Sequence, residues 1–221
     1  MAQARTMERM RRWQGPALFS YGFRPFFLFG ALQAALAVAL FVPWYLGLVA
    51  PPSAFPALAW HTHAMLFGYV PAVVAGFLFT AVPNWTGRMP VVGWPLIGLF
   101  SLWLLGRIAL FASAFFGSVV TALVDLSFLA AFAALIGREI VAARNWRNVK
   151  VLVAVAGLAL ANALFHWELA RFGRAVVAER LAIAAAIWLV SLIGGRIVPS
   201  FTGNWLRRRD PRRASFGFGA V

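Results

Sequence analysis

Apolar residues run in long stretches along this chain, and polar residues gather in the short segments between them. A helix needs roughly 20 mostly apolar residues to cross a bilayer. Six stretches meet this requirement, at residues 26–48, 58–82, 93–115, 117–141, 149–172 and 176–199. Clusters of Gly and Pro separate the first four stretches, and most of the ten tryptophans fall near stretch ends, as expected at a membrane interface. The pattern predicts an all-α fold, a polytopic transmembrane bundle of about six helices.

Composition supports a membrane protein and argues against a nucleic-acid-binding one. Hydrophobic residues make up 62% of the chain and charged residues 12%, against about 25% charged residues in soluble domains. The net charge of +14 is explained more simply by membrane insertion than by nucleic-acid binding, because insertion selects basic loops beside apolar spans. The lipid bilayer is therefore the expected partner. The chain has no cysteine, so disulfides and thiolate metal sites are excluded, and any haem would be held without a covalent link.

The distribution of Lys and Arg predicts the orientation of the spans. Fifteen of the twenty basic residues lie on the side that holds both termini. The opposite side has three, Arg171, Arg174 and Arg180, while Arg107 and Arg196 fall inside predicted spans. The positive-inside rule therefore places both termini in the cytoplasm.

This topology divides the chain into a basic cytoplasmic segment (1–25), a six-span membrane domain (26–206) and a basic cytoplasmic tail (207–221). The cytoplasmic ends of spans two and six are alike: GFLFTAVPNWTGR (76–88) and GGRIVPSFTGNWLRR (194–208) both contain a Val-Pro, predicted to end the helix, and then Asn, Thr, Gly and Trp. The similarity suggests two related three-span halves. A helix stop followed by an interfacial tryptophan would explain the same letters.

The three histidines all fall in the outer leaflet of the predicted topology. His61 and His63 lie at the outer end of the second span, and His166 at the outer end of the fifth. Neutral imidazole is a ligand for haem iron, copper and zinc; an amphipathic position in the headgroup region is the alternative interpretation. Residues two apart on a helix point about 200° apart, so His61 and His63 are not expected to share one ion unless the helix begins after them. Met65, on the face of His61, is either a second ligand or a packing residue.

Two charges lie inside the predicted spans. Arg107 precedes the outer end of span three by about eight residues, and Asp125 lies about eight residues into span four, so the two share one depth. Intramembrane charges are costly and are usually paired or functional. Two interpretations remain open, a structural ion pair and a proton relay in a small-solute or proton transporter without a redox cofactor. No nucleotide loop, nucleophile triad or zinc-protease motif assigns an enzyme class.

Five strings resemble the NnrS family: GPALFSYGFRPFFLFG (15–30), AWHTHAMLFGY (59–69), AGFLFTAVPNWTGR (75–88), WLLGRIAL (103–110) and GGRIVPSFTGNWL (194–206). The resemblance implies a bacterial inner-membrane protein that contains haem and copper and is linked to nitric oxide and nitrosative stress during denitrification. His61 and His63 match the family's WHxHE motif, with Ala64 in place of its acidic residue, and His166 matches a later histidine region. By this resemblance, haem or copper is held near the outer leaflet by His61 or His63 together with His166.

The resemblance also bears on assembly. Members of the family usually carry roughly twice as many spans, so this chain resembles their N-terminal half. We therefore expect a short form that self-associates or pairs with a second half-length chain. The face of His61 continues through Gly68, Ala72 and Ala75. Small residues in such a stripe are typical of close helix packing in membranes, and they are the surface predicted for this contact.

Overall fold

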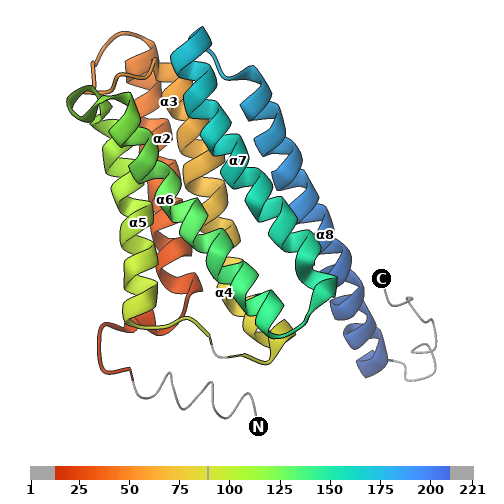
Figure 1. Ribbon diagram of the computed structural model, residues 1–221. Helices are drawn as coiled ribbons and strands as arrows, with labels where there is room; N and C mark the ends of the chain where they lie inside the picture. Colours follow the sequence, from red (N-terminus) through yellow and green to blue (C-terminus); the bar gives the residue numbers. More distant parts are fainter. Residues whose placement is uncertain (1–12, 89, 210–221) are drawn as a thin grey trace.

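The computed structural model describes residues 13–88 and 90–209, and within them it is a helical bundle without strands (Figure 1). Its helices are α2 (Phe23–Tyr45), α3 (Ala57–His63), α4 (Val70–Thr86), α5 (Trp94–Phe111), α6 (Ser113–Ala142), α7 (Val149–Phe172) and α8 (Val176–Arg209). A π-helical segment, Ala64–Tyr69, joins α3 to α4, and short 3₁₀ helices lie at Ala17–Ser20 and Trp146–Asn148.

Within the described residues, six helical spans are long and apolar enough to cross a membrane, in agreement with the predicted number: Phe23–Tyr45, Ala57–Thr86, Trp94–Phe111, Ser113–Ala142, Trp146–Phe172 and Val176–Arg209. Each predicted stretch coincides with one of them. Most of the basic N-terminal segment (residues 1–12) and of the tail (residues 210–221) lies outside the described residues. The all-α, six-span prediction is confirmed.

The Val-Pro pairs do not end their helices, contrary to prediction. Pro83 lies inside α4, which continues to Thr86, and Pro199 lies inside α8, which continues to Arg209. A proline removes one backbone hydrogen bond, and membrane helices tolerate this loss. The stop of α4 is instead Gly87, whose φ of 67° is left-handed, a conformation that glycine adopts without strain.

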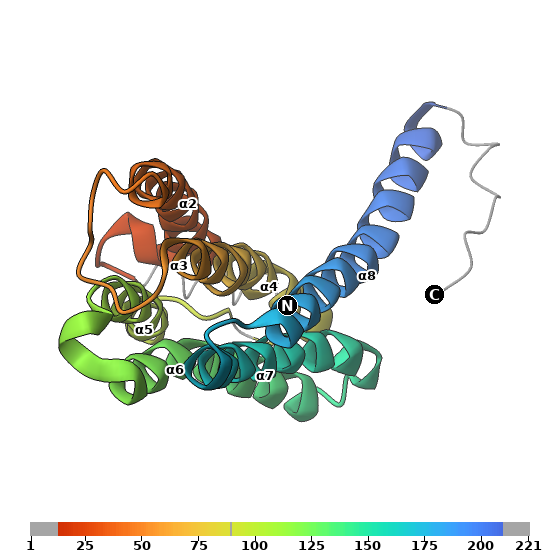
Figure 2. The same cartoon turned by 90° about the horizontal axis from the view of Figure 1, so that it is seen from above.

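Neighbouring helices in the chain pack on one another from α5 through α8, while α2 packs on α3 and α4 (Figures 1 and 2). Helix α8 is the least buried of the six spans, and its C-terminal half diverges from the bundle (Figures 1 and 2). The bundle is therefore compact around α4 and α6 and open beside the end of α8.

The small-residue stripe of α4 packs against α2 of the same chain. Ala72 and Ala75 are fully buried, and a Cβ atom built on Gly30 of α2 would lie 3.1 Å from the Cβ of Ala72. At Gly68 a Cβ atom would approach the side-chain amide of Gln33, also from α2. The stripe is a close-packing surface as predicted, but because α2 covers it, it is not open to a second chain. Self-association itself stays a prediction.

Candidate metal centre

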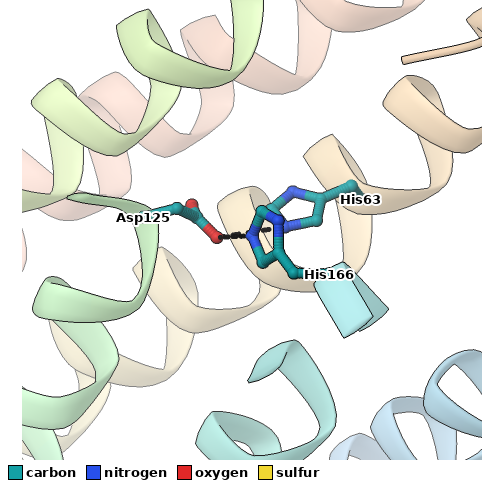
Figure 3. Close-up of side chains that lie close together, drawn as sticks. All are labelled: His63, Asp125 and His166. Atoms are coloured by element: carbon teal, nitrogen blue, oxygen red, sulfur yellow. Dashed lines mark hydrogen bonds and ion pairs between the residues drawn. The ribbon is translucent and has the colours of Figure 1, made fainter. Parts of the chain in front are cut away.

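Two of the three histidines meet one carboxylate in the interior of the bundle (Figure 3). His63 comes from α3, Asp125 from α6 and His166 from α7. Nε2 of His63 lies 3.1 Å from Oδ2 of Asp125, and Nε2 of His166 lies 3.0 Å from the same oxygen. The side chains of His63 and Asp125 are fully buried, and that of His166 is 9% exposed. Three side chains of metal-binding type thus offer one ligand atom each, all within 4.8 Å of one another.

Two further polar side chains complete this cluster. Arg107 of α5 forms an ion pair with Oδ1 of Asp125, so the pairing expected from their common depth is confirmed. Asn162 of α7 donates from Nδ2 to Oδ2 of Asp125 over 2.8 Å, and its Oδ1 lies 2.9 Å from Nε2 of His63. Asp125 is therefore bound from three other helices. These partners offset the large cost of burying a carboxylate.

Glycines let the helices approach closely enough to form the cluster. A Cβ atom on Gly106 would lie 3.1 Å from Oδ1 of Asp125 and 3.2 Å from its Cα, which is tighter than an ordinary van der Waals contact. Gly106 therefore allows α5 to lie against α6 where Arg107 reaches the carboxylate. On α7, Asn162 and His166 are four residues apart and share one face.

The backbone that follows His63 is a π-helix rather than an α-helix. Two of its carbonyl groups accept hydrogen bonds from side chains of other helices. Nε2 of Gln33 donates to the carbonyl of Ala64 over 3.2 Å, and Nε1 of Trp103 donates to the carbonyl of Gly68 over 3.0 Å. Single-turn π-helical segments occur frequently at functional sites. Here the segment ties the backbone next to His63 to α2 and α5.

His61 lies apart from this cluster. Its imidazole stacks on Phe41 of α2, with ring centroids 4.2 Å apart and an interplanar angle of 19°. Its Nδ1 atom is buried and has no hydrogen-bond partner within the described part of the chain. The structure therefore brings His166 together with His63 and leaves His61 on the side of α2, as the 200° separation of the two neighbours requires. Met65 is partly buried against the core, and its role as a ligand stays a prediction.

The donor set suits a single small metal ion. Two imidazole nitrogens and a carboxylate oxygen are ligands used for zinc, copper and non-haem iron. Ligand atoms around a tetrahedral ion with bonds of about 2.0 Å lie roughly 3.3 Å apart, which is close to the 3.0 and 3.1 Å between the imidazole nitrogens and the carboxylate. An ion bound by these three ligands would therefore replace the two hydrogen bonds between the imidazoles and the carboxylate.

A haem does not fit between the same two histidines. Both Nε2 atoms contact one carboxylate oxygen, and Asn162 binds that oxygen as well. A macrocycle with His63 and His166 as its two axial ligands would have to displace Asp125 and Asn162. The cluster can hold an ion, whereas a porphyrin would break the hydrogen bonds that form the cluster.

Asn162 was not predicted as a site residue, although the sequence pattern around it indicates one. It is a polar amide within the apolar run LALANALFH, one helical turn before His166. A polar residue in that place must face the bundle interior, because in lipid it would lack a partner.

Comparison with known proteins gives one result. The family model described as NnrS protein matches residues 17–221. No curated protein and no solved structure shows a significant match to the chain.

Proposed function

The chain belongs to the NnrS family, and from this premise we propose that it is a membrane protein that binds one copper ion in the response to nitric oxide or nitrosative stress. The observation that carries the proposal is the convergence of His63, Asp125 and His166 from three helices. The link to nitric oxide and to a bacterial inner membrane rests on the family alone. We place the ion near the outer leaflet, with both chain termini in the cytoplasm.

Each residue of the cluster has a definite part in this proposal. His63 and His166 supply Nε2, and Asp125 supplies Oδ2, which already face one another. Asn162 holds the carboxylate in place through its amide. Bound copper would supply a one-electron redox couple and a coordination position for a small ligand.

The charge of the cluster favours monovalent copper. Arg107 balances the charge of Asp125, so the ion would be surrounded by two neutral imidazoles and a neutral ion pair. Uncompensated charge is costly in a low-dielectric interior. A Cu⁺ ion leaves one net positive charge there, whereas a divalent ion leaves two.

Haem, the other cofactor implied by the family, has to lie elsewhere. Of the three histidines in the chain, His63 and His166 are committed to the cluster. We therefore propose His61, on the side of α2, as the ligand of haem iron if haem is bound.

Separate measurements of copper and haem test this division. Purified protein in mild detergent, loaded with copper under reducing conditions, should hold about one copper per chain. His63→Ala and His166→Ala should each lower copper affinity at least about ten-fold, because each removes a ligand. His61→Ala is the matched control, and it should keep the copper while losing any Soret absorption. Copper retention by a His63→Ala, His166→Ala double variant would overturn the proposed centre.

A second function is favoured by a different property of the same residues. One buried group of ionisable side chains is formed by Arg107, Asp125, His63 and His166. Such groups inside membranes also carry protons. A small-solute or proton transporter without a redox cofactor would use this group. Protein in liposomes with an internal pH dye distinguishes the two functions: proton flux that is lost in Asp125→Asn, from protein free of copper and haem, supports the transporter.

A further inference from the structure

A groove of about 450 Å³ opens at the end of the bundle remote from the metal centre. Helix α8 diverges from α4 there (Figure 2). Its walls come from the start of α2, the C-terminal half of α4 and the C-terminal half of α8. Within the walls, α4 and α8 contribute parts of the two similar strings, residues 76–88 and 194–208. The two segments that are alike in sequence therefore face each other across one opening.

The lining is apolar and aromatic with a few polar groups. The aromatic residues are Phe23, Phe27, Phe77, Trp85 and Phe201. The polar residues are Thr80, Asn84, Arg196 and Ser200. The groove lies between helices that are long and apolar enough to cross a membrane, so in a bilayer acyl chains would be available to its aromatic walls. A ligand with an apolar body and a polar head matches this lining.

Arg196 supplies an unbalanced positive charge in the groove. Its guanidinium donates to Oδ1 of Asn148 and to the carbonyl of Arg147, and it lies 5.5 Å from the ring centroid of Trp85. All these partner groups are neutral, and Arg196 has no carboxylate partner within the described residues. A guanidinium of this kind binds phosphate through paired N–H groups.

The surroundings of Arg196 are strongly basic. Asn148 directly precedes α7, so its contact with Arg196 places the guanidinium at the membrane interface. The basic residues described at this end of the bundle include Arg138, Arg144, Lys150, Arg207, Arg208 and Arg209. Glu139 is the one acidic residue described there, and it is paired with Arg88 and Arg138. An anion is therefore attracted to this end.

We propose that the groove binds one anionic phospholipid, with its phosphate against Arg196 and an acyl chain along the aromatic wall. Basic pockets between transmembrane helices at the cytoplasmic surface bind anionic headgroups. A second copy of this chain is a poorer occupant, because it would bring the same excess of arginine to the same end.

Native mass spectrometry with a lipid pair tests the proposal. The protein in detergent receives equal amounts of dioleoylphosphatidylglycerol and dioleoylphosphatidylcholine, and the retained lipid is counted. The wild type should retain one phosphatidylglycerol in preference to phosphatidylcholine. Arg196→Gln should lower this preference about five-fold, which corresponds to about one kcal/mol for one basic side chain. Its glutamine can still donate to Asn148, and a melting curve without added lipid checks the fold.

Two further variants make the result specific to the groove. Arg208→Gln removes the same charge from an exposed position of the same helix outside the lining, and it should leave the preference unchanged. Ser200→Trp keeps Arg196 but fills the groove, and it should release both lipids. Equal losses in Arg196→Gln and Arg208→Gln would overturn the proposal, because only general charge attraction would then remain. It would also be overturned by a dimer that Ser200→Trp dissociates, since a second copy would then be the occupant.

Discussion

At the scale of single residues, Asp125 organises the interior of this protein. Its Oδ1 binds Arg107, and its Oδ2 is shared by His63, Asn162 and His166. From the sequence, Arg107 and Asp125 are predicted as a pair, but separately from the histidines, which are predicted at span ends. The bounds of the helices explain why the charged pair and the two histidines form a single cluster. The span Ala57–Thr86 begins six residues before His63, and α7 continues for six residues after His166. Both histidines therefore lie deeper than the ends of their spans.

The shared carboxylate makes the two charges unequal in their effect on stability. Arg107→Leu leaves a buried carboxylate that three side chains still bind, whereas Asp125→Leu strands a buried arginine and removes the common acceptor of those three. Breaking a buried pair costs about 3–5 kcal/mol. We expect Asp125→Leu to lower the free energy of unfolding more than Arg107→Leu. The double variant also removes the stranded arginine, so it should be less destabilised than Asp125→Leu alone, as measured by denaturant titration in detergent.

The ion pair Arg88–Glu139 gives a matched control for that cycle. The Arg88 side chain is 43% exposed, so its coupling to Glu139 should be at most about 1 kcal/mol. Strict additivity of the Arg107 and Asp125 losses would contradict a coupled buried pair.

At the scale of helices, hydrophobic pattern and interfacial tryptophans were sufficient to locate the six spans. They were not sufficient for the π-helical segment Ala64–Tyr69, because a π-turn has no sequence signal comparable to a proline or a glycine stop. That segment is held by tertiary contacts, the hydrogen bonds of Gln33 and Trp103 to its carbonyl groups. The sequence named His63 and His166 as candidate ligands, but it did not show that both contact the carboxylate of Asp125.

Gly68 tests the packing of the π-helical segment. A Cβ atom at this position would run into the guanidinium of Arg107 and approach the amide of Gln33. Gly68→Ala should therefore displace Arg107 and cost about 1–3 kcal/mol, as overpacking in a core does. Gly98→Ala on α5 is the control, since a Cβ atom there meets nothing within 4 Å. We expect that change to alter stability by no more than about 1 kcal/mol. Equal melting temperatures for the two variants would show that a Cβ atom at position 68 is accommodated without displacing Arg107.

At the scale of the whole molecule, the connections between helices separate the two ends of the bundle. At one end, Oγ of Ser53 lies 3.1 Å from Oγ of Ser113, which joins the segment after α2 to the start of α6. At the other end, Nδ2 of Asn145 donates to the carbonyl of Trp85 over 2.7 Å, which joins the segment after α6 to the last turn of α4. Arg196 lies at this second end beside Asn148. A basic residue assigned by sequence to a span interior therefore adds to the excess of charge on one side.

That excess predicts how the molecule is inserted, with the Asn145 end in the cytoplasm and the Ser53 end in the periplasm. Lys and Arg near span ends resist translocation, and the segment after α2, from Leu46 to Pro56, carries neither. Alkaline phosphatase is active only after export, and green fluorescent protein fluoresces only inside, so paired fusions report each site. Fusions after Pro52 and after Gly173 should show phosphatase activity, and fusions after Lys150 and after Arg213 should fluoresce. Phosphatase activity at Arg213 would mean that an odd number of helices crosses the membrane, and the metal centre would then need a new assignment of depth and leaflet.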